Sequence, residues 1–224
     1  SSDVCSSDLP VSQVTINIPE HGAAAKVFRI SPFEQWRVDR TTRRANSPDA
    51  KRYPANELVP GGFITSACSP LIYTADLFPE AYRGNNFVCD PANNLIHREV
   101  VEPKGSVFTA RRVDPDSEFL ASTDNWFRPV TTKTGPDGAL YVADMYRFVI
   151  EHPEWISPEM QARLDLRAGS DKGRIYRVVP EGKARRRIPN LAAMNPRELV
   201  AAMDSVNGWQ RDIAMRLLVE RADP

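Results

Sequence analysis

The chain has 224 residues, of which 42% are hydrophobic, and its 29 basic and 29 acidic side chains give a formal net charge of zero. This length allows one or two domains, and the apolar content is sufficient for a packed core. The balanced charge argues against nucleic-acid and membrane-surface partners, and no stretch approaches the roughly 18 apolar residues that would span a bilayer.

The first nine residues, SSDVCSSDL, have the pattern of neither a targeting segment nor a structural element. A signal peptide needs a basic start and an apolar run, and this stretch has neither. Translated back into codons, Ser1 to Leu9 resemble a short-read sequencing adapter; the alternative is an ordinary serine-rich tail. The adapter interpretation predicts that residues 1–9 make no specific tertiary contacts, that Pro10 is the first genuine residue, and that the chain is an internal fragment of a longer polypeptide.

The segment up to Cys68 is predicted to hold an incomplete β-unit and a long loop. Strand-like patterns occur at Val14 to Ile18 and at Lys26 to Ile30. Residues 31–60 are charged and interrupted by proline, which indicates a loop. Ile64 to Cys68 is strand-like again and would enter the first complete β-unit.

Two stretches repeat the pattern G-x-x-aromatic-V-small-D. Gly84 to Asp90 aligns with Gly138 to Asp144, an offset of 54 residues (138 minus 84), and each copy follows turn-forming residues. Further strands are predicted at residues 94–101, 106–113, 147–151 and 174–179, and a short helix at residues 160–166 with Ser157 as its N-cap. Short strands that are separated by turns and repeat in this way are typical of propeller blades.

Two cysteines outside the first nine residues bear on the cellular compartment. Cys68 ends a strand-like run, and Cys89 lies in the first copy of the repeat. A disulfide between them would indicate an oxidising compartment, whereas free cysteines are often simply buried. Both alternatives are open, and the disulfide requires Cα atoms about 4.4–6.8 Å apart.

The periodicity becomes helical after Pro180. Residues 181–194 are predicted to be a linker, and Asn195 to Glu198 has the outline of a capping box. Asn207-Gly208 then separates two helices that each have one apolar face. Two such helices resemble a HEAT or armadillo unit, which buries its apolar faces by stacking on further units.

These elements predict a mainly β fold with α-helices: a partial β-propeller of about two to three blades followed by HEAT-like helical repeats. The expected domains are an artefactual tail at residues 1–9, the propeller part at 10–180, a linker at 181–194, and the helical repeats at 195–224.

Long stretches of the chain resemble one protein family. They include FITSACSP, YRGNNFVCDPANNLIHREVV, EFLASTDNWFRPV, TGPDGALYVADMYRFVIEHPEW and NGWQRDIAMRLLVER, and the resemblance covers nearly all of residues 24–224. The family is the membrane-bound dehydrogenase family that is abundant in planctomycetes and verrucomicrobia. Its members look like a propeller, similar to sugar and sorbosone dehydrogenases, followed by HEAT-like repeats.

The resemblance implies an oxidoreductase of the periplasm or cell envelope that oxidises a sugar-like alcohol and passes electrons to a c-type haem domain. The CxxCH haem motif does not occur in this sequence, so haem would belong to a further C-terminal part. Pyrroloquinoline quinone enters only by analogy with the fold of quinoprotein glucose dehydrogenases. The alternative is a non-catalytic binding module that holds a polysaccharide or a protein partner.

Four candidate site residues, His97, Arg98, Asp144 and Arg147, stand at the ends of predicted strands. In a propeller such positions can converge on one mouth of the channel, where a neutral histidine accepts a proton and an arginine stabilises an anionic cofactor or alkoxide. The simpler roles are a turn cap for Asp144 and a surface ion pair between Arg147 and Glu151. No metal site and no nucleotide-binding motif is predicted.

Overall fold

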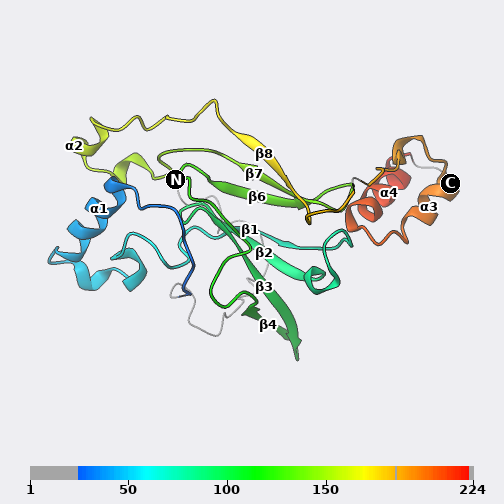
Figure 1. Cartoon of the computed structure of the whole chain (residues 1–224), viewed down its shortest axis with the longest axis horizontal. Coiled ribbons are helices and arrows are strands. Elements are labelled where there is room, and N and C mark those ends of the chain that lie inside the picture. The colour runs from blue at the N-terminus through cyan, green and yellow to red at the C-terminus, as the bar shows by residue number, and fades with distance from the viewer. Residues whose placement is uncertain (1–24, 185, 222–224) are drawn as a thin grey trace.

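The computed structural model describes residues 25–184 and 186–221. Two antiparallel β-sheets form its main body, and helices lie at both ends of the strands (Figure 1). The expectations for residues 1–9 and for a strand at residues 14–18 lie outside the described residues.

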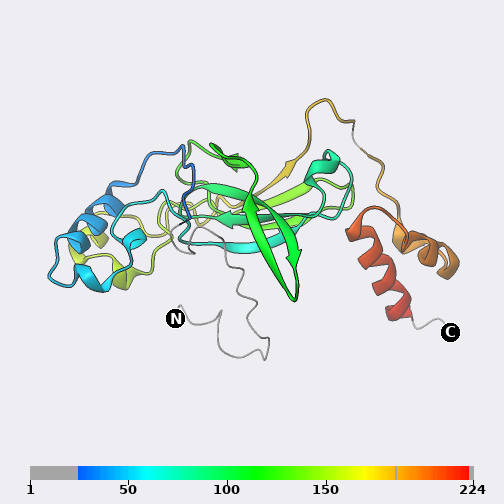
Figure 2. The ribbon, with the colours of Figure 1, turned by 90° about the horizontal axis from the view of Figure 1, so that it is seen from below.

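The first sheet has the strand order β1-β2-β3-β4, with β5 also paired to β3. Its elements are β1 (Cys68–Ile72), the 3-10 helix η4 (Glu80–Tyr82), β2 (Asn85–Asp90), β3 (Leu95–Lys104), β4 (Val107–Arg112) and β5 (Leu120–Ala121). Because β4 pairs only with the outer part of β3, the hairpin of these two strands extends away from the sheet (Figure 2). The strands predicted at 94–101 and 106–113 are confirmed, whereas the strand predicted at 64–68 begins only at Cys68.

The second sheet has three strands in the order β6-β7-β8. Its elements are β6 (Pro129–Thr134), β7 (Leu140–Asp144), η5 (Pro153–Trp155), α2 (Pro158–Gln161) and β8 (Arg174–Val178). The predicted strand at 174–179 is confirmed, but the one at 147–151 is wrong, because this segment directs its backbone NH groups to other loops. Ser157 caps α2 as predicted, although the helix ends at Gln161.

The two copies of the repeat occupy equivalent places in the two sheets. Gly84 (φ +77°) and Gly138 (φ +84°) both adopt the left-handed conformation that glycine tolerates, just before an inner strand. Asp90 and Asp144 both end that strand, and one oxygen of each accepts a backbone NH of the following turn, at 3.3 Å and 2.8 Å. The local structure therefore confirms the repeat that the sequence predicts.

The two sheets pack together through opposite faces of this repeat. The core side chains of β2 are Phe87 and Cys89, whereas those of β7 are Leu140 and Val142, which stand one position earlier in the repeat. Successive side chains of a strand point to opposite faces, so sheets related by a two-fold axis would bury equivalent positions instead. The sheets consequently stack front to back.

The segment predicted as a loop at residues 31–60 contains a helix. Its elements are α1 (Gln35–Ala45), η2 (Ala50–Arg52) and η3 (Ala55–Glu57). The buried side of α1 carries Trp36, Arg37 and Thr41 instead of an apolar stripe, so hydrophobic periodicity does not predict this helix. The strand predicted at 26–30 is also wrong, since Lys26 makes an isolated bridge to Phe63.

The C-terminal helices form a small core of their own. They are η6 (Leu191–Ala193), α3 (Pro196–Ala202) and α4 (Gly208–Arg221). The predicted capping box is confirmed, with the Asn195 side chain accepting from the NH of Glu198 (3.0 Å) and the Glu198 carboxylate accepting from the NH of Asn195 (2.8 Å). Leu199 and Ala214 are fully buried where α3 and α4 meet.

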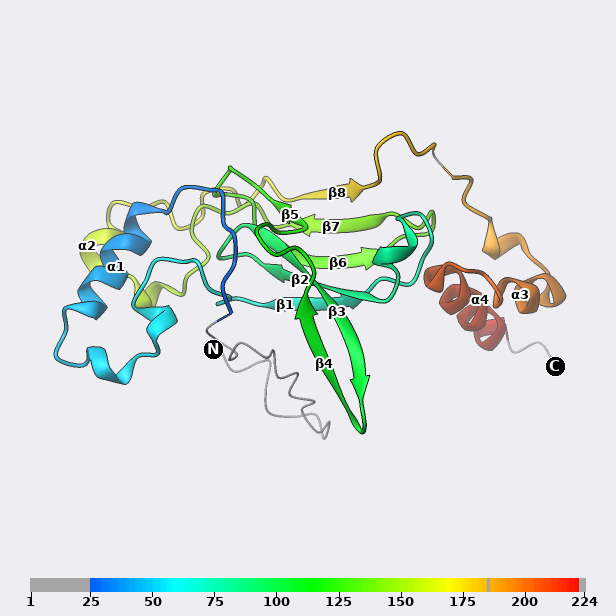
Figure 3. The ribbon, with the colours of Figure 1, turned by 60° about the horizontal axis from the view of Figure 1, so that its bottom comes forward.

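The helical pair is joined to the second sheet at the turn between β6 and β7. The Asn207 amide donates to the carbonyls of Gly135 (3.0 Å) and Pro136 (3.1 Å), and the NH of Gly208 donates to the Thr74 carbonyl (2.8 Å). A Cβ at position 208 would lie 2.2 Å from Thr74 Oγ1, so this approach requires glycine. Figure 3 shows this helical pair at one end of the strands and α1 with α2 at the other.

The fold is thus a mixed α/β arrangement dominated by antiparallel strands. Neither sheet closes on itself within residues 25–184 and 186–221, so closure into a propeller stays a prediction. In the same ranges no helix combines the length and the apolar character needed to cross a bilayer.

Candidate functional site

A cavity of about 400 Å³ lies between α1, the segment after it, and the loop after β7. Its charged lining residues are Arg37, Arg40 and Arg44 from α1, together with Glu57 and Glu151. This volume falls in the range of small-ligand sites, about 300–1,000 Å³.

The helix α1 directs the three arginines to one side. Positions 37, 40 and 44 are spaced by three and four residues, which brings them onto one helical face. Their side chains are 6%, 13% and 17% exposed. Arg40 pairs with Glu151, and Arg44 Nη1 lies 2.9 Å from Glu57 Oε2, whereas Arg37 Nε is 3.6 Å from the nearest carboxylate oxygen of Glu34.

The positive charge in the cavity is incompletely neutralised. Among the described residues each of the three arginines has a glutamate within 4 Å, but Glu34, the partner of Arg37, is shared with Arg29 and Arg128. Among the described residues, the buried Nε atoms of Arg37 and Arg40 have no hydrogen-bond acceptor. Burial, with repulsion from Arg37 and Arg44, lowers the pKa of Arg40 to about 10. A bound anion would add negative charge beside these guanidinium groups.

Beneath the cavity, Glu34 forms an ion cluster that holds α1 against the sheets. Its Oε1 lies 2.5 Å from Arg128 Nη2, and its Oε2 lies 3.1 Å from Arg29 Nη2, with all three side chains nearly or fully buried. Arg128 also donates to three backbone carbonyls of the β2–β3 turn and the loop after β7. Burial by itself raises the pKa of Glu34, but Arg128 and Arg37 outweigh it and hold that pKa below its usual value.

Aromatic and hydroxyl side chains complete the wall of the cavity. Trp155 is 52% exposed at its edge, and the Arg44 guanidinium lies 5.1 Å from the centre of the Tyr53 ring. Ser66 Oγ donates to Asp90 Oδ1 at 2.6 Å, which ties the wall to the end of β2. Arginines beside aromatic faces suit a ligand that has both an acidic group and a ring.

Among the predicted site residues, His97 and Arg98 lie on β3 and are both paired. His97 Nδ1 is 2.6 Å from Glu118 Oε2, and its Nε2 is 3.6 Å from Glu99 Oε1. Burial works to lower the pKa of His97, but the hydrogen bonds to Glu118 and Glu99 outweigh it and raise that pKa. Both ring nitrogens thus face carboxylates, which leaves neither of them free to accept a proton from a substrate. Arg98 makes a two-pronged pair with Asp114, at 2.9 and 3.1 Å.

Asp144 and Arg147 have structural partners beside Arg128. Asp144 Oδ1 accepts from the NH of Arg128 (2.7 Å) and from an NH of the following turn (2.8 Å), so the predicted turn cap is confirmed. The predicted pair between Arg147 and Glu151 is wrong, because Glu151 pairs with Arg40 and the Arg147 guanidinium donates to a backbone carbonyl at 2.9 Å.

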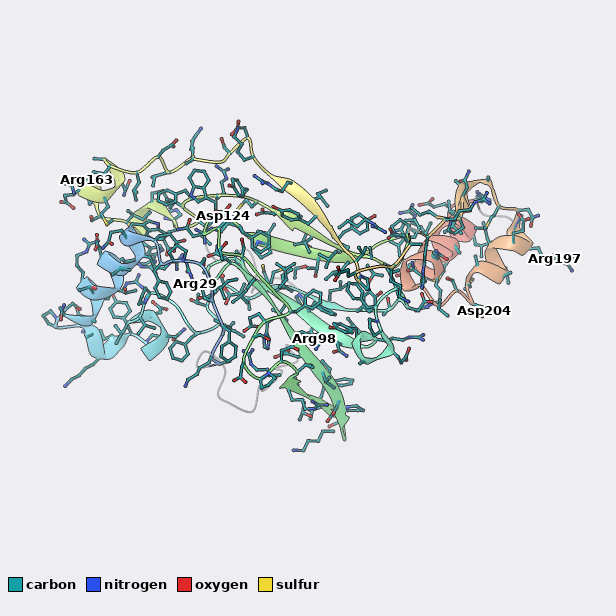
Figure 4. The ribbon with its side chains drawn as sticks, viewed as in Figure 1. Arg29, Arg98, Asp124, Arg163, Arg197 and Asp204 are labelled. Atoms are coloured by element: carbon teal, nitrogen blue, oxygen red, sulfur yellow. The ribbon has the colours of Figure 1, made fainter. Side chains whose placement is uncertain are left out.

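The structure does not bring the four predicted residues around one cavity. None of them lines the arginine-lined cavity or the smaller cavity of about 290 Å³ beside Trp209. Figure 4 shows Arg98 apart from Arg29, which lies near α1. A catalytic role for the four residues stays a prediction that this geometry does not favour.

The two cysteines face each other across neighbouring strands. Cys68 of β1 and Cys89 of β2 are partners in the antiparallel register. Both are free thiols, Cys68 half-buried and Cys89 fully buried. The sequence leaves open a disulfide or two free thiols, and the structure has two free thiols in neighbouring strands.

The arginines of α1 are site residues that the sequence did not identify. Their signal is the spacing R-x-x-R-x-x-x-R within QWRVDRTTRR, which becomes a single face only if the segment is helical. Because this segment is predicted as a loop, the spacing does not indicate from the sequence that the three arginines lie on one side.

A protein-family model, described as a domain of unknown function (DUF7133), matches residues 5–182. No curated protein and no solved structure matches the chain. For the part of the chain that the structure describes, no group of three or more His, Cys, Asp and Glu side chains is placed to hold a metal ion.

Proposed function

The chain belongs to the DUF7133 family, and from that premise we propose that it is a binding module whose arginine-lined cavity takes an acidic ligand. The proposal is carried by one observation: the described residues that line the cavity include three arginines of α1 and two glutamates.

The cavity is suited to an oxyanion. A guanidinium is a planar fork that matches a carboxylate, sulfate or phosphate in two-pronged geometry. The guanidinium groups of Arg37, Arg40 and Arg44 line the cavity, so an anion bound there is attracted by their charge and can accept hydrogen bonds from them.

An acidic carbohydrate is the ligand class that fits the remaining wall. Tyr53 and Trp155 provide aromatic faces, on which the apolar CH face of a sugar ring packs. Asn56 adds a polar side chain of the kind that hydrogen-bonds sugar hydroxyls. The ligand is therefore a sugar that carries a carboxylate or sulfate group, as in a charged polysaccharide.

The module consists of two neighbouring blades of a β-propeller with the first unit of a HEAT-like helical stack. Front-to-back stacking of the sheets supports this, because blades around a ring repeat one contact, whereas a two-fold sandwich buries equivalent faces. Location in the periplasm or cell envelope is part of the same proposal and rests on the family resemblance.

The oxidoreductase hypothesis has less support from the geometry than the binding hypothesis. Its proton acceptor, His97, is buried beside two carboxylates, and its Arg98 is paired with Asp114. An acid–base catalyst has to reach the proton that it moves. The cavity, by contrast, is lined by three arginines of α1.

The test is calorimetric titration of the full chain with an oligogalacturonate, a neutral oligogalactoside of equal length, inorganic sulfate and inorganic phosphate. Arg40→Gln is the test variant. Arg43→Gln is the matched control, since Arg43 is an exposed arginine of the same helix that does not line the cavity. Thermal unfolding establishes that both variants are folded.

We expect the acidic oligosaccharide to bind and the neutral one not to bind. Loss of a hydrogen bond to a charged group is worth about 1.5–3 kcal/mol, so Arg40→Gln should weaken binding by about tenfold or more, with Arg43→Gln unchanged. Equal effects of the two variants, or no binding of any anion, would overturn the proposal. Binding of phosphate alone would retain an anion site and refute the carbohydrate.

A further inference from the structure

The pairing of β1 with β2 sets two thiols directly opposite each other. Cys68 and Cys89 are Cα partners in this antiparallel pair. Opposite residues of antiparallel strands have Cα atoms about 4.5–5.5 Å apart, which lies inside the range of about 4.4–6.8 Å that a disulfide accepts. A bond between the two sulfur atoms therefore needs no rearrangement of the strands.

The two thiols differ in access to solvent. Cys89 is fully buried in the core shared by the sheets, whereas Cys68 is half-buried at the edge of the same core. The Cys68 thiol donates to the Val130 carbonyl at 3.5 Å, so it faces the second sheet as Cys89 does. A reagent from solvent consequently reaches Cys68 before it reaches Cys89.

The backbone at Cys68 is the irregular end of β1. The register shifts between Cys68 and Leu71, and Ser69 has a φ of +50°, a conformation that residues other than glycine seldom adopt. Few ladder hydrogen bonds can form across such an irregularity. A covalent link at Cys68 would fasten the strand where its pairing is interrupted.

We infer that Cys68 and Cys89 form a thiol–disulfide exchange site that takes a small disulfide such as oxidised glutathione and yields an intramolecular disulfide between β1 and β2. In the first step the Cys68 thiolate attacks the small disulfide, which gives a mixed disulfide and one released thiol. In the second step Cys89 attacks the Cys68 sulfur, which releases the second thiol. The two protein thiols lose two electrons and two protons, and the small disulfide gains them.

The electrostatics of the pair assign the order of these steps. Donation from the neighbouring Cys89 thiol lowers the pKa of Cys68, against the opposing effect of burial. The same interaction, together with burial, raises the pKa of Cys89. Since the thiolate is the nucleophile, Cys68 is the attacking residue, and Cys89 is the residue that resolves the mixed disulfide.

The experiment uses the full chain with Cys5→Ser, so that Cys68 and Cys89 are its only cysteines. The reduced protein is incubated with oxidised glutathione, quenched by alkylation, digested and examined by mass spectrometry. The variants are Cys89→Ser and Cys68→Ser, each checked by circular dichroism and repeated in denaturant, where burial no longer protects either thiol.

We expect a Cys68–Cys89 cross-link in the parent protein and release of two molecules of reduced glutathione per chain. Cys89→Ser should stop at a stable Cys68–glutathione adduct. The Cys89 thiol of folded Cys68→Ser should react with oxidised glutathione at least about 100-fold more slowly than the Cys68 thiol of folded Cys89→Ser. Two glutathione adducts without a cross-link, two unreacted thiols, or equal rates for the two folded variants would each overturn the inference. If a serine variant does not fold, the presence or absence of the parent cross-link decides the question.

Discussion

Replacement of Arg128 by methionine tests whether the ion cluster beneath the cavity holds the molecule together. Arg128 is fully buried, pairs with Glu34 at 2.5 Å, and donates to the carbonyls of Pro91, Arg147 and Phe148 at 2.8–3.0 Å. One guanidinium thus links the segment before α1, the β2–β3 turn and the loop after β7. Arg128→Met removes the charge and all of these donors while keeping much of the side-chain volume.

Removing one partner of a buried ion pair costs about 3–5 kcal/mol, because the other partner is left buried and uncompensated. Here Glu34 retains Arg29 at 3.1 Å and Arg37 at 3.6 Å, which places the expected loss toward the lower end of that range. For a chain of about this length each kcal/mol lowers the unfolding midpoint by about 2–4 °C. At about 3 kcal/mol the expected fall is therefore roughly 6–12 °C.

The assay is urea and thermal unfolding followed by circular dichroism and by the fluorescence of the tryptophans, one of which, Trp36, is buried beside the cluster. The matched control is Arg111→Met, since Arg111 pairs with Glu102 at 3.3 Å while both side chains are more than half exposed. Such a surface pair is worth about 0–1 kcal/mol. The two variants therefore remove the same group from the same kind of pair at opposite extremes of burial.

The dependence on pH has a definite sign. The pKa of Glu34 is held below its ordinary value, so its contribution to stability is present above about pH 4.5 and is lost as the pH falls through the folded-state pKa. The difference in stability between the parent and Arg128→Met should shrink over that acidic range. If Arg128→Met costs no more than Arg111→Met, or if the difference is independent of pH, the structural role assigned to the cluster is wrong.

Two further predictions concern the helical pair and the buried histidine. Gly208→Ala would place a Cβ 2.2 Å from Thr74 Oγ1 and should destabilise the protein by about 1–3 kcal/mol in urea unfolding. Gly173→Ala is the control, because the nearest atom to a new Cβ there is 3.7 Å away. Equal effects of the two substitutions would contradict the contact between the helical pair and Thr74. The imidazole of His97 should titrate above its ordinary value of 6.5 in an NMR experiment and lower in Glu118→Gln. Its stabilisation is then full below about pH 6.5 and lost as the pH rises through the folded-state pKa, and a parent midpoint at or below 6.5 would refute the pairing.

The parts of the fold that the sequence predicts correctly depend on interactions between near neighbours. The capping box of α3 joins residues only three positions apart. The glycines and aspartates of the repeat set turns through their own backbone conformation and through bonds two or three residues along the chain. Such interactions join residues only a few positions apart, so a short window of sequence contains both partners.

The α1 helix and its arginine-lined cavity are decided by the tertiary structure. The buried face of α1 carries arginines that are stabilised by carboxylates from elsewhere in the chain, so it lacks the apolar period that indicates a helix. Glu34 and Arg128 are 94 residues apart in sequence. No local pattern shows which buried charge will meet which partner.

The same distinction separates the outcomes for the predicted site residues. Asp144 is recognisable as a turn cap because one of its partners is the NH two residues further along the chain, in the turn that follows its strand. The hydrogen bonding of His97 depends on Glu118, 21 residues away in sequence, and only the fold brings Glu118 Oε2 to 2.6 Å from His97 Nδ1. The cysteines follow this rule as well: their spacing is plain in the sequence, but only the register of β1 on β2 sets them opposite each other. Turns and caps are determined by residues close together in the sequence. Ion pairs, cavities and facing thiols arise from contacts between distant segments, which form only when the whole core is assembled.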